Sequence, residues 1–217
     1  MYTIQTLNAI SPVIYNHLPQ EDFTVSKEAA QPDAVIVRSA SMLEMELPGS
    51  LLSIARAGAG YNNIPVDKCT AAGICVFNTP GANANAVKEL VLAGLLLASR
   101  DIIGSIEWAK GLKPGPEIQG KTLGVMGLGA IGVLVANAAE ALGMKVIGYD
   151  PFLSVDNAWA LSRSIQRSNS LEALLEQSDY VTIHIPLSDK TRNMIDESML
   201  AKMKPSAALL NYSRAEL

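Results

Sequence analysis

Short apolar segments rich in β-branched residues recur along the first third of the chain, and polar or helix-like stretches separate them. This spacing predicts strands at residues 3–7, 23–25, 34–38, 52–57 and 75–78. Residues 34–37 are apolar at successive positions, which is typical of a strand covered on both faces. The alternation predicts an α/β fold in which parallel strands are joined by helical crossovers.

A proline-free stretch from Asn83 to Gly111 carries an apolar face at helical spacing, formed by Val87, Leu90, Val91, Leu95, Ile102 and Ile106. This period predicts one long helix. Residues 110–120 then bring two prolines and three glycines, the composition of a linker. We therefore place a domain boundary between residues 112 and 113, so that the long helix closes the first domain.

The second half of the chain again alternates between strand-like and helix-like patterns. Helices are predicted at residues 130–142, 171–177 and 199–204, and strands at 145–149, 179–185 and 207–212. Residues 151–169 show neither period and are predicted as a loop. Two α/β domains with parallel sheets are therefore expected.

The clearest motif lies at residues 122–132, TLGVMGLGAIG, where an apolar run leads into Gly127, Gly129 and Gly132. In a dinucleotide-binding turn the first glycine permits a sharp bend, the second lets main chain approach the pyrophosphate, and the third lets the helix pack on its strand. The pyrophosphate then lies at a helix N-terminus, where free N–H groups favour negative charge. A glycine-rich turn without a ligand has the same spacing, so the context must decide.

That context is an acidic residue after the next strand. Asp150 follows the predicted strand at 145–149 and lies 18 residues after Gly132. A carboxylate at this place accepts both ribose hydroxyls of an adenosine and repels a 2′-phosphate. We therefore expect NAD rather than NADP as the cofactor, with a coincidental surface aspartate as the alternative.

Composition and charge limit the classes of binding partner that this chain can have. The net charge is −4 and no Lys/Arg cluster occurs, so a nucleic-acid partner is not expected, whereas a small anion needs only a local site. The most apolar window, residues 90–99, is too short to span a membrane, and the N-terminus lacks a signal-peptide pattern. Cys69 and Cys75 have no metal-binding spacing, so we interpret them as reduced thiols of a cytoplasmic protein and expect no metal.

Two further strand ends carry groups that suit an anion. Arg38 and Ser39 emerge where the predicted strand at 34–38 ends, at the edge where open α/β sheets bind ligands. Residues 58–60, Gly-Ala-Gly, follow the strand at 52–57, and the amides of such a turn can hold a carboxylate. A solvated arginine and a plain loop are the structural alternatives.

Taken in order, these segments resemble the D-isomer-specific 2-hydroxyacid dehydrogenases. The resemblance rests on VRSA at 37–40, RAGAGYNNIPVD at 56–67, NTPGANANAVKEL at 78–90, GKTLGVMGLGAIG at 120–132, YDP at 149–151, HIPLSDKTR at 184–192 and NYSRAEL at 211–217. It implies two flavodoxin/Rossmann-like domains, a substrate-binding domain over residues 1–112 and an NAD-binding domain over 113–217. It also implies a C-terminal return of the chain to the substrate domain, which these 217 residues do not include.

The resemblance further implies roles for single residues. In the family's chemistry, hydride moves between C4 of nicotinamide and C2 of the substrate, while an arginine orients the carboxylate and polarises the carbonyl. Arg214 takes this catalytic place. The cofactor positions are Gly127, Gly129, Ala130, Ile131, Gly132, Asp150, Pro186, Thr191, Tyr212 and Ser213, and the substrate positions are Arg38, Ser39, Ala59 and Gly60.

Two features depart from the family pattern. The histidine that exchanges the hydroxyl proton and its supporting glutamate follow the arginine in the family, which places them beyond Leu217. His184, beside the cofactor motif, and His17, near the N-terminus, are poor substitutes for them. Residues 110–116 are also shorter than the family's usual loop.

Within the family, the VRSA strand end, the RAGAG turn and EWAKG at 107–111 look most like the branch that acts on 3-phosphoglycerate in serine biosynthesis. We therefore expect NAD-dependent conversion of 3-phosphoglycerate to 3-phosphohydroxypyruvate by a homodimer or higher homo-oligomer. The alternatives are a glyoxylate/hydroxypyruvate or D-lactate-type reductase of the same family, and a non-catalytic NAD-sensing binding protein.

Overall fold

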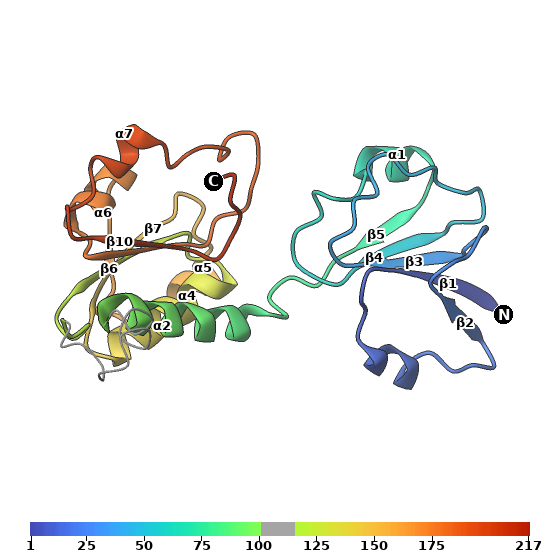
Figure 1. The fold of residues 1–217 in the computed structure, drawn as a ribbon, viewed down its shortest axis with the longest axis horizontal. Helices are drawn as coiled ribbons and strands as arrows, with labels where there is room; N and C mark the ends of the chain where they lie inside the picture. The colour runs from blue at the N-terminus through green and yellow to red at the C-terminus, as the bar shows by residue number, and fades with distance from the viewer. Residues whose placement is uncertain (101–115) are drawn as a thin grey trace, which may run out of the picture. The chain divides into compact units, whose positions relative to one another are not determined.

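The computed structural model describes residues 1–100 and 116–217, which form two compact units (Figure 1). Unit 1 comprises Met1–Asn83 and unit 2 comprises Ala84–Leu217. Each unit contains a five-stranded sheet in which all neighbouring strands run parallel. The predicted α/β class with two parallel, Rossmann-like sheets is confirmed.

The sheet of unit 1 has the strand order β2-β1-β3-β4-β5, the flavodoxin-like order. Its strands begin and end within two residues of the predicted positions: β1 (Tyr2–Leu7), β2 (Phe23–Ser26), β3 (Ala34–Val37), β4 (Ser53–Arg56) and β5 (Cys75–Phe77). Helical structure in this unit is limited to the 3-10 turn η1 (Pro12–Asn16) and α1 (Val66–Ala71).

The prediction of helical crossovers in unit 1 is wrong for two connections, β2 to β3 and β3 to β4. Residues 27–33 and residues 38–52 contain no helix. Met42 and Leu51 from the second of these connections are buried in the same core cluster as Val35 and Ile54. The backbone is fixed by a hydrogen bond from the Met42 N–H to the Asn63 carbonyl oxygen, at 2.8 Å. An irregular segment thus covers the sheet where a helix was expected.

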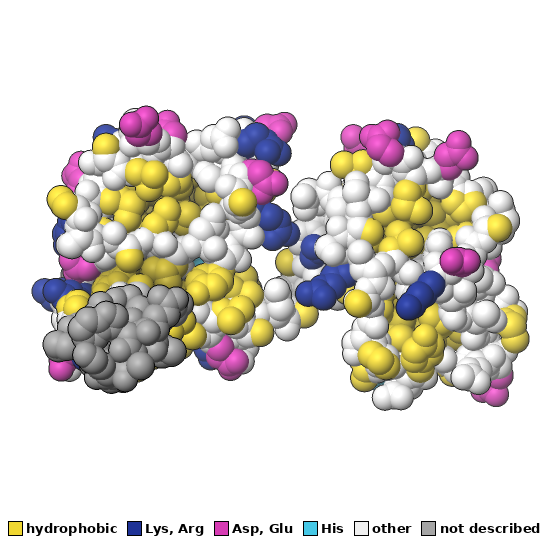
Figure 2. All heavy atoms as spheres, in the orientation of Figure 1, with side chains coloured by type: hydrophobic (Ala, Val, Ile, Leu, Met, Phe, Trp, Pro, Cys, Tyr) yellow, Lys and Arg dark blue, Asp and Glu magenta, His cyan; other side chains and the backbone are white. Residues whose placement is uncertain are grey.

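Burial in β3 also differs from the prediction. Val35 and Val37 are buried, whereas Ala34 and Ile36, which point to the other face, are partly exposed. The prediction that residues 34–37 are covered on both faces is therefore wrong for the described residues. Figure 2 shows apolar side chains, in yellow, between charged ones on the visible surface of each unit.

The sheet of unit 2 has the order β10-β9-β6-β7-β8, which read from β8 is the 3-2-1-4-5 order of a Rossmann half. The strands are β6 (Thr122–Met126), β7 (Lys145–Tyr149), β8 (Gln166–Arg167), β9 (Tyr180–Ile183) and β10 (Ala208–Asn211). Helices α2 (Ala84–Arg100) and α4 (Ala130–Ala141) pack against one core cluster. Helix α6 (Leu171–Gln177) packs against a second core cluster on the other face (Figure 1).

The predicted loop at residues 151–169 is a partial error. It contains α5 (Val155–Ala160), which has no buried residue, and the two-residue strand β8, which is exposed. An exposed short element has no apolar period, so the pattern could not predict it. The last helix, α7 (Glu197–Leu200), begins earlier than predicted because the Asp196 carboxylate caps it by accepting from the Met199 N–H at 2.9 Å.

The long helix predicted over residues 83–111 is present as α2 up to Arg100, and its remainder lies outside the described residues. The predicted domain boundary between residues 112 and 113 lies outside them as well. The structure assigns α2 to unit 2 rather than to the first domain, because Val91 and Leu95 are fully buried in one core cluster with Val135 of α4. An apolar face shows that a helix packs but not on which sheet.

Candidate functional site

Parallel strands present their carboxyl ends at one edge of a sheet, so the loops that follow β10, β9, β6 and β7 lie in series along one edge of unit 2. From one end of this series to the other, these loops carry Arg214, Pro186, the glycine turn and Asp150. The chain reverses its crossover direction between β9 and β6. A ligand site is expected at such a switch point.

The glycine turn has the conformation that the motif requires. Gly127 has φ of +85°, and its N–H donates to the Tyr149 carbonyl oxygen at 2.9 Å. A Cβ on Gly127 would lie 2.9 Å from the His184 carbonyl oxygen, so a larger residue would disturb the end of β9. A Cβ on Gly132 would collide with the carbonyl oxygen of Gly127. The sharp turn and the close helix packing predicted from the sequence are therefore present.

The N-terminus of α4 is open to an anion. Gly129 is the N-cap residue and no side chain caps the helix. Space is free beside Gly129, since a Cβ there would meet nothing within 4 Å. Ala130 and Ile131 form the first turn, which has no acidic residue. Uncapped N–H groups, the helix dipole and free space together suit a pyrophosphate.

Asp150 has a structural role that the motif did not indicate. One carboxylate oxygen accepts from the Leu128 N–H and the other from the Phe152 N–H, each at 2.8 Å. The side chain therefore holds the glycine turn against the end of β7. A carboxylate has about four lone-pair sites, so both oxygens keep acceptor capacity for ribose hydroxyls.

The loop after β9 is held by Thr191, whose hydroxyl donates to the Pro186 carbonyl oxygen at 2.7 Å. His184 lies at the end of this strand. Its Nε2 is 3.0 Å from the Thr182 hydroxyl, and burial lowers the pKa of His184 to about 4. The ring is therefore neutral at neutral pH and lacks the second ring proton that an imidazolium ion gives when it acts as a general acid.

The loop after β10 is fixed by its own polar groups. The Ser213 hydroxyl donates to the Ile183 carbonyl oxygen at 2.8 Å, and the Asn211 amide donates to the Arg214 carbonyl oxygen at 2.7 Å. Arg214 itself is exposed. The Tyr212 ring lies against α2, because a Cβ on Gly94 would collide with its hydroxyl. Its side chain is thus directed to the helix that flanks the strand.

The four predicted substrate residues belong to unit 1. Arg38 and Ser39 are exposed directly after β3, and Ala59 and Gly60 follow β4. The Asn8 side-chain oxygen accepts from the backbone N–H groups of Ser39 and Ala40, which orders the loop that carries Arg38. The Asn78 amide likewise donates to the Ala59 carbonyl oxygen at 2.7 Å.

Arg56 was part of a motif but not selected as a site residue. Its guanidinium group packs beneath the turn after β4, where a Cβ on Gly58 would collide with it. Among residues 1–100 and 116–217, no group of His, Cys, Asp and Glu side chains could hold a metal ion. No helix in the same ranges is long and apolar enough to cross a membrane.

The sequence of this chain is similar to a family model and to several known dehydrogenases. The family model described as D-isomer specific 2-hydroxyacid dehydrogenase, NAD binding domain, matches residues 92–217. The chain is 39% identical over 196 residues to D-3-phosphoglycerate dehydrogenase of Mycobacterium bovis, a match that covers 86% of this chain and 37% of the relative. It is 36% identical over 216 residues to hydroxypyruvate reductase of Thermotoga maritima, covering 93% of this chain and 66% of the relative.

A solved structure agrees with these relatives. An NAD⁺-bound 3-phosphoglycerate dehydrogenase of Entamoeba histolytica superposes with a TM-score of 0.78 at 27% identity, covering 99% of this chain and 72% of that one. The chain thus contains an NAD-binding domain. It spans only 37% of the length of its phosphoglycerate dehydrogenase relative.

Proposed function

The chain belongs to the D-isomer-specific 2-hydroxyacid dehydrogenase family, and from that premise we propose that it interconverts 3-phosphoglycerate and 3-phosphohydroxypyruvate with NAD. The observation that supports this substrate is the exposed Arg38-Ser39 pair after β3 in unit 1. A phosphorylated hydroxy acid carries two anionic groups, so it needs a cation besides Arg214. This reaction would be a step of serine biosynthesis.

The residues of unit 2 fit the cofactor. The uncapped first turn of α4 would hold the pyrophosphate, and Asp150 would accept the ribose hydroxyls. When bound, NAD supplies the hydride acceptor or donor at C4 of its nicotinamide. Arg214 would pair with the substrate carboxylate and polarise the C2 carbonyl, which stabilises the charge that develops on oxygen.

The hydroxyl proton needs a partner other than the two histidines of this chain. His184 is partly buried and neutral, and His17 is an exposed residue at the end of η1 in unit 1. The family resemblance assigns this task to a histidine and a glutamate that follow Arg214. A positioned acid or base contributes about 10²- to 10⁴-fold in rate. We therefore expect the 217-residue chain to bind NADH and to turn over slowly.

Hydroxypyruvate reduction is the second candidate, and the relative that is 36% identical over 93% of this chain favours it. The two substrates differ only by the phosphate group. The test is NADH oxidation with phosphohydroxypyruvate, hydroxypyruvate and glyoxylate, using the 217-residue chain and any longer product of the same gene. We expect kcat/KM for phosphohydroxypyruvate to be at least about tenfold higher than kcat/KM for hydroxypyruvate. A tenfold ratio corresponds to the free energy of about one charge-assisted hydrogen bond.

Arg38→Ala sharpens this test. It should raise KM for phosphohydroxypyruvate by about tenfold and lower kcat little, because the contact exists in both ground and transition states. The kcat/KM for hydroxypyruvate should stay within about twofold of the wild-type value. Equal losses on both substrates would favour the reductase. NADH binding without turnover in a longer product would instead favour the NAD-sensing alternative.

A further inference from the structure

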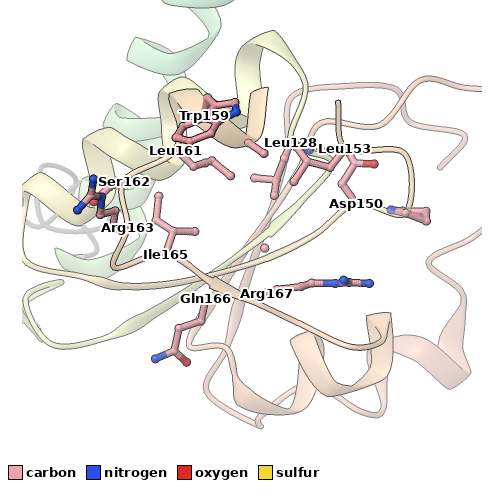
Figure 3. Close-up of a pocket in the computed structure, with 13 residues that line it drawn as sticks. Leu128, Asp150, Leu153, Trp159, Leu161, Ser162, Arg163, Ile165, Gln166 and Arg167 are labelled. Carbon is pink, nitrogen blue, oxygen red and sulfur yellow. Dashed lines mark hydrogen bonds between the residues drawn. The ribbon is translucent and has the colours of Figure 1, made fainter. Parts of the chain in front are cut away.

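A cavity of about 680 Å³ opens beside β7 and β8 in unit 2 (Figure 3). Leu128, Leu161 and Ile165 give it an apolar wall. Leu128 is the middle residue of the glycine turn, and Asp150 at the end of β7 also lines the cavity. The cavity therefore adjoins the part of the site where Asp150 is expected to bind the adenosine ribose.

Strand register places a cation on the same face as Asp150. Gly148 of β7 pairs with Arg167 of β8 in parallel register, and paired residues direct their side chains to one face. Asp150 follows Gly148 by two residues, so the alternation of side chains directs it to that face too. Figure 3 shows Arg167 and Asp150 toward one end of the cavity and Arg163 toward the other.

Gly148 makes this arrangement possible. A Cβ there would lie 2.7 Å from the Leu128 side chain, so the position must stay small for the glycine turn to pack on β7. The missing side chain also leaves the floor between Arg167 and Asp150 open. The two charged residues are diagonal neighbours across adjacent strands, a spacing that long side chains can reach across.

The charges at the cavity favour an additional anion. Its described lining residues include one carboxylate, Asp150, and two guanidinium groups, Arg163 and Arg167. Both oxygens of Asp150 already accept backbone N–H groups. Neither arginine forms an ion pair with another described residue. An incoming phosphate would therefore meet a local excess of positive charge, whereas a lone aspartate would repel it.

We propose that Arg167 determines cofactor choice in this chain. Its positive charge offsets the negative charge of Asp150 and binds a 2′-phosphate on the adenosine ribose. The site therefore binds NADP(H) as well as NAD(H). This inference deepens the cofactor site and rests on the proposed placement of the ribose at Asp150. It does not depend on which hydroxy acid is the substrate. It also revises the expectation, drawn from Asp150 alone, that a 2′-phosphate is excluded.

The experiment measures binding without catalysis, so it is independent of the proposed substrate. NADH and NADPH are titrated into the 217-residue protein by fluorescence, and adenosine 5′-diphosphate and adenosine 2′,5′-bisphosphate by calorimetry. In the wild type, the Kd for NADPH should lie within about tenfold of that for NADH. Arg167→Gln should weaken NADPH and the bisphosphate by about tenfold or more, while NADH changes by less than about twofold.

Arg163→Gln is the matched control, since it removes the same charge from the opposite end of the cavity. It should change the NADPH to NADH ratio by less than about twofold. Arg167→Lys keeps the charge and should keep NADPH binding, which separates loss of charge from loss of folding. An unchanged ratio in Arg167→Gln, or wild-type NADPH binding more than about 100-fold weaker than NADH binding, would overturn the proposal. Failure of the wild type to bind NADH would instead count against the dinucleotide site itself.

Discussion

Unit 1 and unit 2 share a five-stranded parallel sheet but differ in how that sheet is covered. In unit 2, β6 is buried from Leu123 to Met126 and all four residues of β9 are buried. In unit 1, β3 alternates between buried and partly exposed residues, and β4 has one buried residue. In unit 2 helices contribute core residues to both faces of the sheet, whereas the core cluster of unit 1 lies on one face of its sheet.

The difference shows that strand pairing and burial are set by different parts of the sequence. Parallel pairing follows from right-handed crossovers of sufficient length, with or without a helix in them. Burial follows from what each connection brings to the sheet. In unit 1 the connection after β3 supplies Met42 and Leu51 to one face. In unit 2, α2, α4 and α6 supply apolar stripes to both faces.

The sharpest way to test this difference is a pair of glycine substitutions. Gly132→Ala places a Cβ against the Gly127 carbonyl oxygen in unit 2, and backbone cannot easily yield there. We expect a loss of about 3 kcal/mol or more in the free energy of unfolding, together with loss of NADH binding. Gly49→Ala in unit 1 meets nothing within 4 Å and should change stability by less than about 0.5 kcal/mol.

Urea unfolding measures both variants. Circular dichroism follows the unfolding of the whole chain, and NADH binding reports on unit 2. A Gly132→Ala protein as stable as the wild type would mean that α4 can move away from the turn. The close packing of helix and strand would then not be required for the fold.

Adjacent residues on one strand provide the next test. Val125 and Met126 of β6 are 0% and 1% exposed and contribute to the core clusters on opposite faces. Val125→Ala and Met126→Ala should each cost about 2 kcal/mol or more in unfolding free energy. In β3, Val37→Ala should cost a similar amount but Ile36→Ala only about 1 kcal/mol, since Ile36 is partly exposed. Equal losses at Ile36 and Val37 would contradict one-sided burial in unit 1.

Prediction from the sequence succeeded where the constraint is local. Gly127 and Gly132 occupy positions whose backbone geometry depends on a few neighbouring residues, and the structure shows the predicted sharp turn at Gly127 and the predicted close packing at Gly132. Apart from β8, the strand positions in both units also followed from short apolar runs bounded by turn residues. Their bounds agree with the structure to within two residues.

Prediction failed where the outcome depends on distant partners. The apolar face of α2 indicates that it packs, but only the three-dimensional arrangement shows that its partner is α4. Arg167 lies in a stretch without a hydrophobic period. Its side chain lies on the same face of the sheet as Asp150 because of the register of β8 with β7, which the sequence does not reveal. The motif also did not predict the second role of Asp150, as acceptor for two backbone N–H groups.

A pH titration tests whether burial differs between the units as described. The pKa of His184 in unit 2 is lowered from 6.5 to about 4 by burial, so between these values the unfolded state binds more protons than the folded state. Stability from this group is therefore complete above about pH 6.5 and is lost as the pH falls toward 4. After allowance for partial exposure, the loss should be about 2 kcal/mol.

The measurement is the urea midpoint of unit 2 as a function of pH, compared among three proteins. His184→Gln should flatten the part of the curve between about pH 6.5 and 4. His17→Gln removes an exposed imidazole from unit 1 and should leave the curve unchanged. A His184→Gln protein that keeps the wild-type pH dependence would show that the imidazole is accessible to water in the folded state.

The smallest expected effect comes from two separate substitutions, Asp150→Asn in unit 2 and Asn8→Asp in unit 1. Each changes the side chain that orders a loop at the end of a strand. In unit 2 each Asp150 oxygen accepts one backbone N–H, so Asp150→Asn turns one acceptor into a donor and should cost about 1 kcal/mol. In unit 1 a single oxygen of Asn8 accepts from Ser39 and Ala40, so Asn8→Asp keeps both bonds and should change stability by less than about 0.5 kcal/mol. Its new charge beside Arg38 should nevertheless weaken binding of a phosphorylated substrate. Urea unfolding and NADH titration of the two variants decide the matter, because equal stability losses would show that loop anchoring does not distinguish the units.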